Sequence, residues 1–103
     1  MVLNLPIVWS APAEEMLERI LAYIEYENLD AARRIWALAM EALEAAARFP
    51  EAAPQLPGLA RNYRAIVSVR PLRILYRVEG RQLRVIAVLR QEQDFDPARF
   101  LGT

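Results

Sequence analysis

The chain has 103 residues, 55% of them apolar, and thirteen arginines balance ten glutamates and three aspartates to a formal charge of zero. This length predicts one domain, residues 1–103, and the composition excludes a disordered tail. The absence of histidine, lysine and cysteine excludes Ser-His and Cys-His nucleophile pairs, disulfides and thiolate metal sites, so we expect no metal and no cofactor.

The first predicted element is a short strand near the N-terminus. Leu3, Leu5, Ile7 and Trp9 alternate with other residues, which is the period of a half-buried strand. Pro6 has no amide hydrogen to donate, so this strand should lie at the edge of a sheet.

Two amphipathic helices follow. Ser10 is the expected cap of the first, which ends near Glu27 after apolar residues at helical spacing. Asp30 is the expected cap of the second, which ends before Phe49-Pro50. Few residues separate the helices, so they should form an antiparallel hairpin. The apolar face expected for the second helix consists of Ala32, Ile35, Trp36, Ala39, Ala42, Leu43 and Ala46.

Three strands are predicted in the second half, after a proline-rich loop over residues 50–58. Residues 61–69, 72–78 and 83–89 are rich in Val, Ile, Leu and Tyr, and Glu79-Gly80 is a tight-turn signal between the last two. Short connections favour an antiparallel meander. The predicted fold class is therefore α+β: an N-terminal edge strand, an antiparallel helical hairpin, and a three-stranded antiparallel meander packed on the helices.

The alternation along these strands separates two faces. The odd positions of 63–69 and their counterparts in the next two strands are apolar or aromatic and should form the core, Tyr63 and Tyr76 included. The opposite face mixes arginine with aliphatic residues, unlike the polar solvent face of an ordinary antiparallel sheet. We expect a partner to cover this face. The alternative is that arginine stems pack on the aliphatic side chains and keep their charged heads in water.

Charge is distributed unevenly along the chain. Residues 1–57 carry four arginines and nine acids, a balance of −5, whereas residues 58–103 carry nine arginines and four acids, a balance of +5. This asymmetry suggests an anionic partner for the basic half. The alternative is that the acidic helices simply pair with the basic strands.

Five segments together resemble the RelE/ParE toxin superfamily of type II toxin–antitoxin modules. The last two, in succession, are the most specific, and the order and spacing of all five carry the resemblance. These segments are Ile7–Ala13, Ala31–Ile35, Phe49–Arg61, Pro71–Val78 and Val85–Leu89.

The resemblance implies a helical hairpin on a small, mostly antiparallel sheet, and a bacterial toxin held inactive by a cognate antitoxin. RelE-like members cut messenger RNA in the ribosome, whereas ParE-like members poison DNA gyrase. The antitoxin's C-terminal segment wraps the toxin, and many relatives form toxin–antitoxin heterotetramers.

The residues favour the ParE-like branch. RNA cleavage through the 2′-hydroxyl needs a base and an acid, yet His and Lys are absent, and arginine transfers protons poorly at neutral pH. Arg90 stands where many relatives carry His. Ribosome-targeting relatives are also strongly basic, as polyanion binding favours, whereas this chain has a net charge of zero. The acidic tail of Glu92, Asp94 and Asp96 is a candidate source of a base but is more simply a turn and helix cap.

We therefore expect a cytoplasmic, non-enzymatic gyrase inhibitor with no catalytic residue, no signal peptide and no membrane span. The alternatives are a RelE-like endoribonuclease acting on the ribosome and a non-toxic homologue that only binds antitoxin. The helix pair is a second candidate antitoxin surface, with Tyr23 and Tyr26 as interface-type residues; the alternative for each is a core position or chance exposure. The arginines expected to contact target or antitoxin are Arg64, Arg73, Arg77, Arg84 and Arg90. The aliphatic residues expected to dock an antitoxin helix or strand are Ile66, Leu75, Ile86 and Val88.

Overall fold

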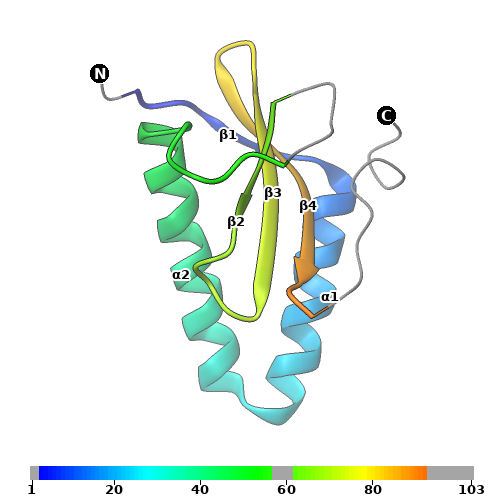
Figure 1. Cartoon of the computed structure of the whole chain (residues 1–103). Helices are drawn as coiled ribbons and strands as arrows, with labels where there is room; N and C mark the ends of the chain where they lie inside the picture. Colours follow the sequence, from blue (N-terminus) through cyan, green and yellow to red (C-terminus); the bar gives the residue numbers. More distant parts are fainter. Residues whose placement is uncertain (1–2, 57–61, 93–103) are drawn as a thin grey trace.

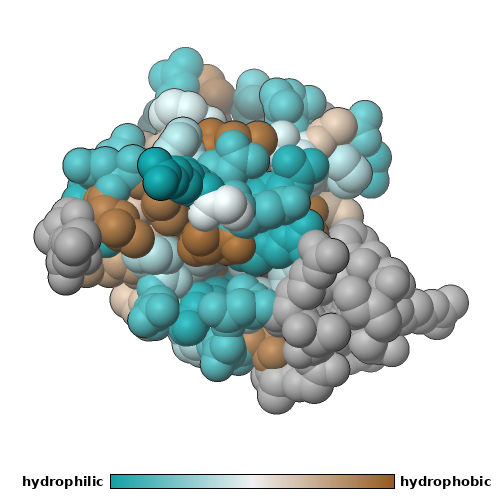
Figure 2. All heavy atoms as spheres, turned by 90° about the horizontal axis from the view of Figure 1, so that it is seen from above, coloured by the Kyte–Doolittle hydropathy of each residue, from teal (hydrophilic) through white to brown (hydrophobic). Residues whose placement is uncertain are grey.

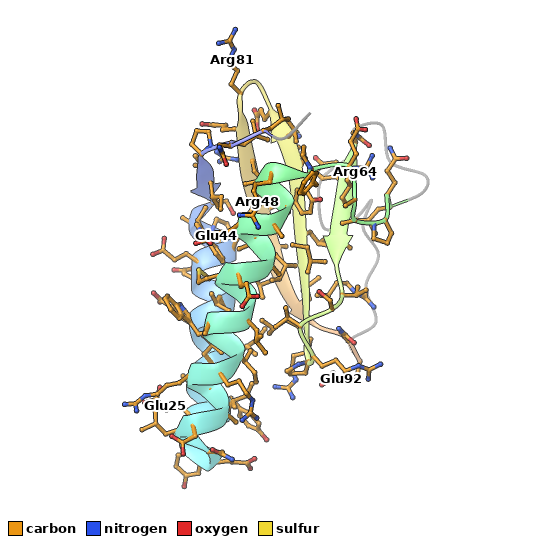
Figure 3. All side chains as sticks on the ribbon, turned by 90° about the vertical axis from the view of Figure 1, so that its left-hand side faces the viewer. Glu25, Glu44, Arg48, Arg64, Arg81 and Glu92 are labelled. Carbon is orange, nitrogen blue, oxygen red and sulfur yellow. The ribbon has the colours of Figure 1, made fainter. Side chains whose placement is uncertain are left out.

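The computed structural model describes residues 3–56 and 62–92, which form two helices and a four-stranded sheet. The helices lie together on one side and the sheet on the other (Figures 1 and 3). The α+β class and the order of the elements are therefore confirmed. The elements are β1 (Ile7–Trp9), α1 (Ala11–Glu27), α2 (Leu29–Arg48), β2 (Tyr63–Ile66), β3 (Leu72–Glu79) and β4 (Gln82–Arg90).

The sheet has the strand order β1-β4-β3-β2. The last three strands form the predicted antiparallel meander, and β1 lies at the edge, parallel to β4. Gly80 has a φ of +63° in the β3–β4 turn, a conformation that glycine adopts without strain. Over residues 3–56 and 62–92, neither helix has the length and hydropathy required of a membrane span.

Side-chain caps explain where both helices begin. The Ser10 hydroxyl accepts a hydrogen bond from the Ala13 amide and donates one to the Ile86 carbonyl, so it also ties α1 to β4. Asn28, and not the predicted Asp30, caps α2: its side chain accepts from the Ala31 amide at 3.0 Å. Asn28 also ends α1 by donating its own amide to Ile24, so one residue forms the whole connection.

The main core lies between the helices and the sheet. Leu17 on α1 and Leu43 on α2 pack there with fully buried residues of β3 and β4, including Tyr76 and Val85. Trp36 was predicted to share this core, but its side chain is 52% exposed. The prediction is wrong because the apolar stripe of α2 is wider than the part of the helix that the sheet covers.

Two strands place their side chains differently from the prediction. In β2, Ile66 is paired with Ile74 and faces the helices, whereas Ala65 pairs with Leu75 on the other side. The pairing of β4 with β3 shifts by one residue, because Leu75 pairs with Ala87 whereas the next residue, Tyr76, pairs with Val85. Ile86 is therefore the extra residue of a β-bulge in β4. A one-residue shift moves every following side chain to the opposite face.

A second buried cluster results on the sheet face turned away from the helices, here called the outer face. It consists of Ala65, Leu75, Ala87 and Leu89, with Leu56 and, from α1, Met16 packed against it. Predicted core residues Val67 and Val78 are instead substantially exposed. The outer face carries, in addition to the second cluster, Tyr63, Arg73, Arg77, Glu79 and Arg84.

Candidate functional site

The five arginines expected on one face divide between the two sides of the sheet. Arg73 and Arg77 lie on the outer face because each is two residues from Leu75 in β3 and therefore points to the same side. Arg84 lies there too, because it pairs with Arg77. Arg64 pairs with Tyr76, and Arg90 pairs with Leu72, so both lie on the side of the helices. The single arginine face is therefore wrong in part, owing to the β2 register and the β4 bulge.

The four aliphatic residues expected to be exposed are all at least partly buried. Ile66 and Val88 belong to the main core, and Leu75 is fully buried in the second cluster. Ile86, at the bulge, is half-buried. A side chain already packed in a core has little apolar surface left to offer a partner, so the structure does not support an exposed aliphatic docking surface.

Arg77 is at the centre of a polar network on the outer face. Its guanidinium lies over the Tyr63 ring, with 5.4 Å from the central carbon to the ring centroid, and donates to the Tyr63 hydroxyl at 3.0 Å. It also donates to the Glu79 carboxylate at 3.0 Å. These contacts hold the planar guanidinium in one orientation.

Arg84 lies directly opposite Arg77 on the neighbouring strand. Like charges in such a cross-strand pair repel one another. The Glu79 carboxylate lies between them, 3.0 Å from Arg77 and 3.9 Å from Arg84. One carboxylate therefore offsets two guanidinium groups.

Arg73 and Arg64 hold loops in place. Arg73 donates to the Gln91 carbonyl at 3.3 Å, beside the hydrogen bonds by which the Gln91 amide group secures the β2–β3 connection. Arg64 donates to the carbonyls of Glu51 and Ala53, so it fixes the loop after α2 to the edge strand.

A groove of about 510 Å³ separates α1 from the C-terminal end of β4. Arg90 lies over the Tyr23 ring at 5.6 Å and forms an ion pair with Glu92 at 2.7 Å. Tyr23 and Tyr26 are 63% and 92% exposed, so neither belongs to the core. The groove is lined by Met16, Arg19, Ile20, Tyr23, Val88, Leu89, Arg90 and Glu92.

The groups that could move protons are few. Tyr76 is buried and donates to the Pro50 carbonyl at 2.9 Å; burial raises the pKa of its phenol, although the charge of Arg64 opposes this. Tyr63 lies on the outer face, contrary to prediction, but is only 4% exposed. The hydrogen bond from Arg90 lowers the pKa of the exposed Glu92 carboxyl. Asp94 and Asp96 lie outside the described residues.

The chain is similar to known toxins in sequence and in fold. The family model described as "ParE toxin of type II toxin-antitoxin system, parDE" matches residues 7–95. This chain belongs to the ParE toxin family. A chain of the solved "Chromosomal ParDE TA system from P. aeruginosa" shares its fold, with a TM-score of 0.65 and 18% identity over 86% of this chain and 98% of that one. No functionally curated protein matches it in sequence.

The family confirms the predicted ParE-like membership and implies a cognate antitoxin as partner. The sequence pattern of this ParE-family toxin did not predict the Tyr63–Arg77–Glu79–Arg84 network or the groove beside α1. The available signal for the network was that Arg77 and Glu79 are two residues apart in β3, which places them on the same face of the strand. The structure confirms this shared face. No signal in the sequence located the bulge that separates Arg84 from Arg90.

Proposed function

We propose that this toxin acts by binding DNA gyrase, performs no covalent chemistry, and is held inactive by its cognate antitoxin. The observation that carries the proposal is the state of its two buried tyrosines. Tyr76 is enclosed in the core with its hydroxyl already bonded, and Tyr63 is covered, with its hydroxyl accepting from Arg77. Neither is placed to exchange a proton with a substrate, and the chain has no histidine or lysine to replace them.

One observation favours the rival function, a ribosome-dependent endoribonuclease. The outer face brings a tyrosine, a carboxylate and two arginines together, which are the residue types that RNA cleavage uses. Against it, the Glu79 carboxylate is paired with both arginines. To act as a base, the Glu79 carboxylate would have to break these ion pairs before it accepts a proton from the 2′-hydroxyl.

The outer-face arginines Arg73, Arg77 and Arg84 are the proposed contacts to a protein partner. Charge-assisted hydrogen bonds from a fixed guanidinium suit recognition of carboxylates. The exposed Tyr23 and Tyr26 of α1 are the second proposed surface, for the antitoxin, because tyrosine combines apolar area with a polar tip.

Two assays separate the candidates. Purified gyrase is tested for loss of supercoiling activity with added toxin, and a translation extract is tested for cleavage of messenger RNA. We expect loss of supercoiling without cleavage. Cleavage without gyrase inhibition supports the endoribonuclease instead. If both assays are silent and the antitoxin still binds tightly, the chain is a non-toxic homologue.

A residue-level test uses the two sides of the sheet. The double variant Arg73→Ala, Arg84→Ala should stay folded and lose toxicity in cells, because both side chains lie on the outer face. Arg64→Ala is the matched control: it should lower stability, by loss of two hydrogen bonds to the loop, before it affects target binding. A folded double variant that remains toxic contradicts the outer face as the contact surface.

A further inference from the structure

The hairpin end of the outer face carries more positive than negative charge. Arg77 and Arg84 lie on the strands that flank the β3–β4 turn, and Arg81 lies in the turn. Among the described residues, Glu79 is the carboxylate that pairs with Arg77 and Arg84. Figure 3 shows Arg81 projecting from the hairpin tip. Figure 2 looks down on this end and shows hydrophilic residues over much of the described surface. The four residues leave a net charge of +2.

The two strand arginines differ in how exposed and how firmly held they are, and the Nε of Arg77 is buried without a hydrogen-bond partner among the described residues. Arg77 is only 15% exposed and is held from behind by Tyr63. Arg84 is 37% exposed, and its contact with Glu79, at 3.9 Å, is longer than a hydrogen bond. Among the described residues, no other acceptor is paired with Arg84. Its guanidinium is therefore open to a second carboxylate.

We propose that the Arg77–Arg84 pair is a carboxylate-binding site for an acidic peptide segment of a protein partner. Glu79 occupies part of this site and competes with the partner's carboxylate. Removing its charge therefore strengthens binding, although the same change removes an ion pair within the toxin.

Two features favour an acidic peptide over a nucleic acid. Proteins that bind single strands stack bases on exposed aromatic rings, yet the Tyr63 ring is covered by Arg77 and is 4% exposed. The site also already holds one side-chain carboxylate, that of Glu79, between the two guanidinium groups. The inference rests on the proposed function in taking a protein as the partner.

The test is fluorescence anisotropy of the full-length toxin with a labelled peptide of alternating glutamate and alanine, at low salt. The control probes are the same peptide with glutamine for glutamate and a single-stranded oligothymidine. We expect the glutamate peptide to bind most tightly. We expect the affinity for the glutamate peptide to rise roughly fivefold in Glu79→Gln and to fall roughly fivefold in Arg84→Gln. A change of this size is what one partly screened charge contributes to binding.

Arg33→Gln is the matched control. Arg33 is exposed on α2, on the helix side of the sheet and not on the outer face, and its substitution changes the net charge by the same amount as Arg84→Gln. Each variant is first shown by circular dichroism to unfold at a temperature close to that of the unaltered toxin. If Arg84→Gln is unstable, Arg84→Lys replaces it, since it keeps the charge but loses the planar fork.

Three results overturn the inference: weaker binding by Glu79→Gln, an equal loss in Arg33→Gln and Arg84→Gln, or tighter binding of the oligothymidine than of the peptide. Failure of peptide binding with gyrase inhibition intact refutes this site alone. Intact peptide binding without gyrase inhibition refutes the gyrase assignment and leaves the site standing.

Discussion

Replacing Leu75 with alanine tests whether the outer face of the sheet holds a packed second cluster. Leu75 is 0% exposed there, packed with Ala65, Ala87 and Leu89. Truncation removes three carbon atoms, which contribute about 0.8 kcal/mol each when buried, and the cavity left behind adds to the loss. We expect a decrease of about 3 kcal/mol in the free energy of unfolding, or on the order of 15 °C in melting temperature for a domain of this size.

The assay is urea denaturation followed by circular dichroism, with Val78→Ala as the matched control. Val78 lies in the same strand but is 44% exposed, so its truncation should cost less than about 1 kcal/mol. A cost below about 1 kcal/mol for Leu75→Ala would refute the reasoning, since an unpacked leucine on an open face loses no more than that.

Three further predictions concern individual contacts. Asn28→Ala should cost about 1 kcal/mol in urea denaturation and Asp30→Ala clearly less, because the Asn28 side chain caps α2; the reverse order would restore Asp30 as the cap. Burial raises the pKa of Tyr76 above its ordinary 10.0, so the unfolded state loses this proton first and stability falls as pH rises beyond about 10. The urea midpoint of Tyr76→Phe should fall less over that range, and an identical profile contradicts the assignment. In Arg90→Gln, the pKa of Glu92 measured by NMR titration should move up towards its ordinary value, whereas an unchanged pKa excludes the Arg90 hydrogen bond as its cause.

Much of the fold could be predicted because it depends on local patterns. The helical spacing of apolar residues and the Ser10 cap specify α1, and Glu79-Gly80 specifies the turn between β3 and β4. The edge position predicted from Pro6 is confirmed, although β1 begins at Ile7, so that Leu3, Leu5 and Pro6 precede the strand. The alternation in β3 also predicted its two faces correctly, with Tyr76 inside and Arg77 outside.

The candidate site was predicted less well because both sides of this sheet are packed. In β2, Ala65 and Ile66 are apolar neighbours, and each is buried on a different side. Hydrophobicity cannot then distinguish the two registers. The prediction also treated the three strands as regular. Because of the bulge at Ile86, the residues that follow it in β4, Val88, Leu89 and Arg90 among them, lie on the face opposite to the one predicted.

The sequence by itself determined the element order and the fold class, since these follow from periodicity and turn residues. The order of its motifs carried the resemblance to the RelE/ParE superfamily, and the missing histidine and lysine favoured the ParE-like branch. The sequence also determined the absence of histidine and lysine, on which the proposal of a binding toxin depends. Only the tertiary structure decided which arginines share a surface. Pairing with β3 and a single extra residue in β4 place Arg77 beside Arg84 and turn Arg64 and Arg90 towards the helices. Cross-strand register depends on packing between distant segments, and no local pattern in either strand encodes it.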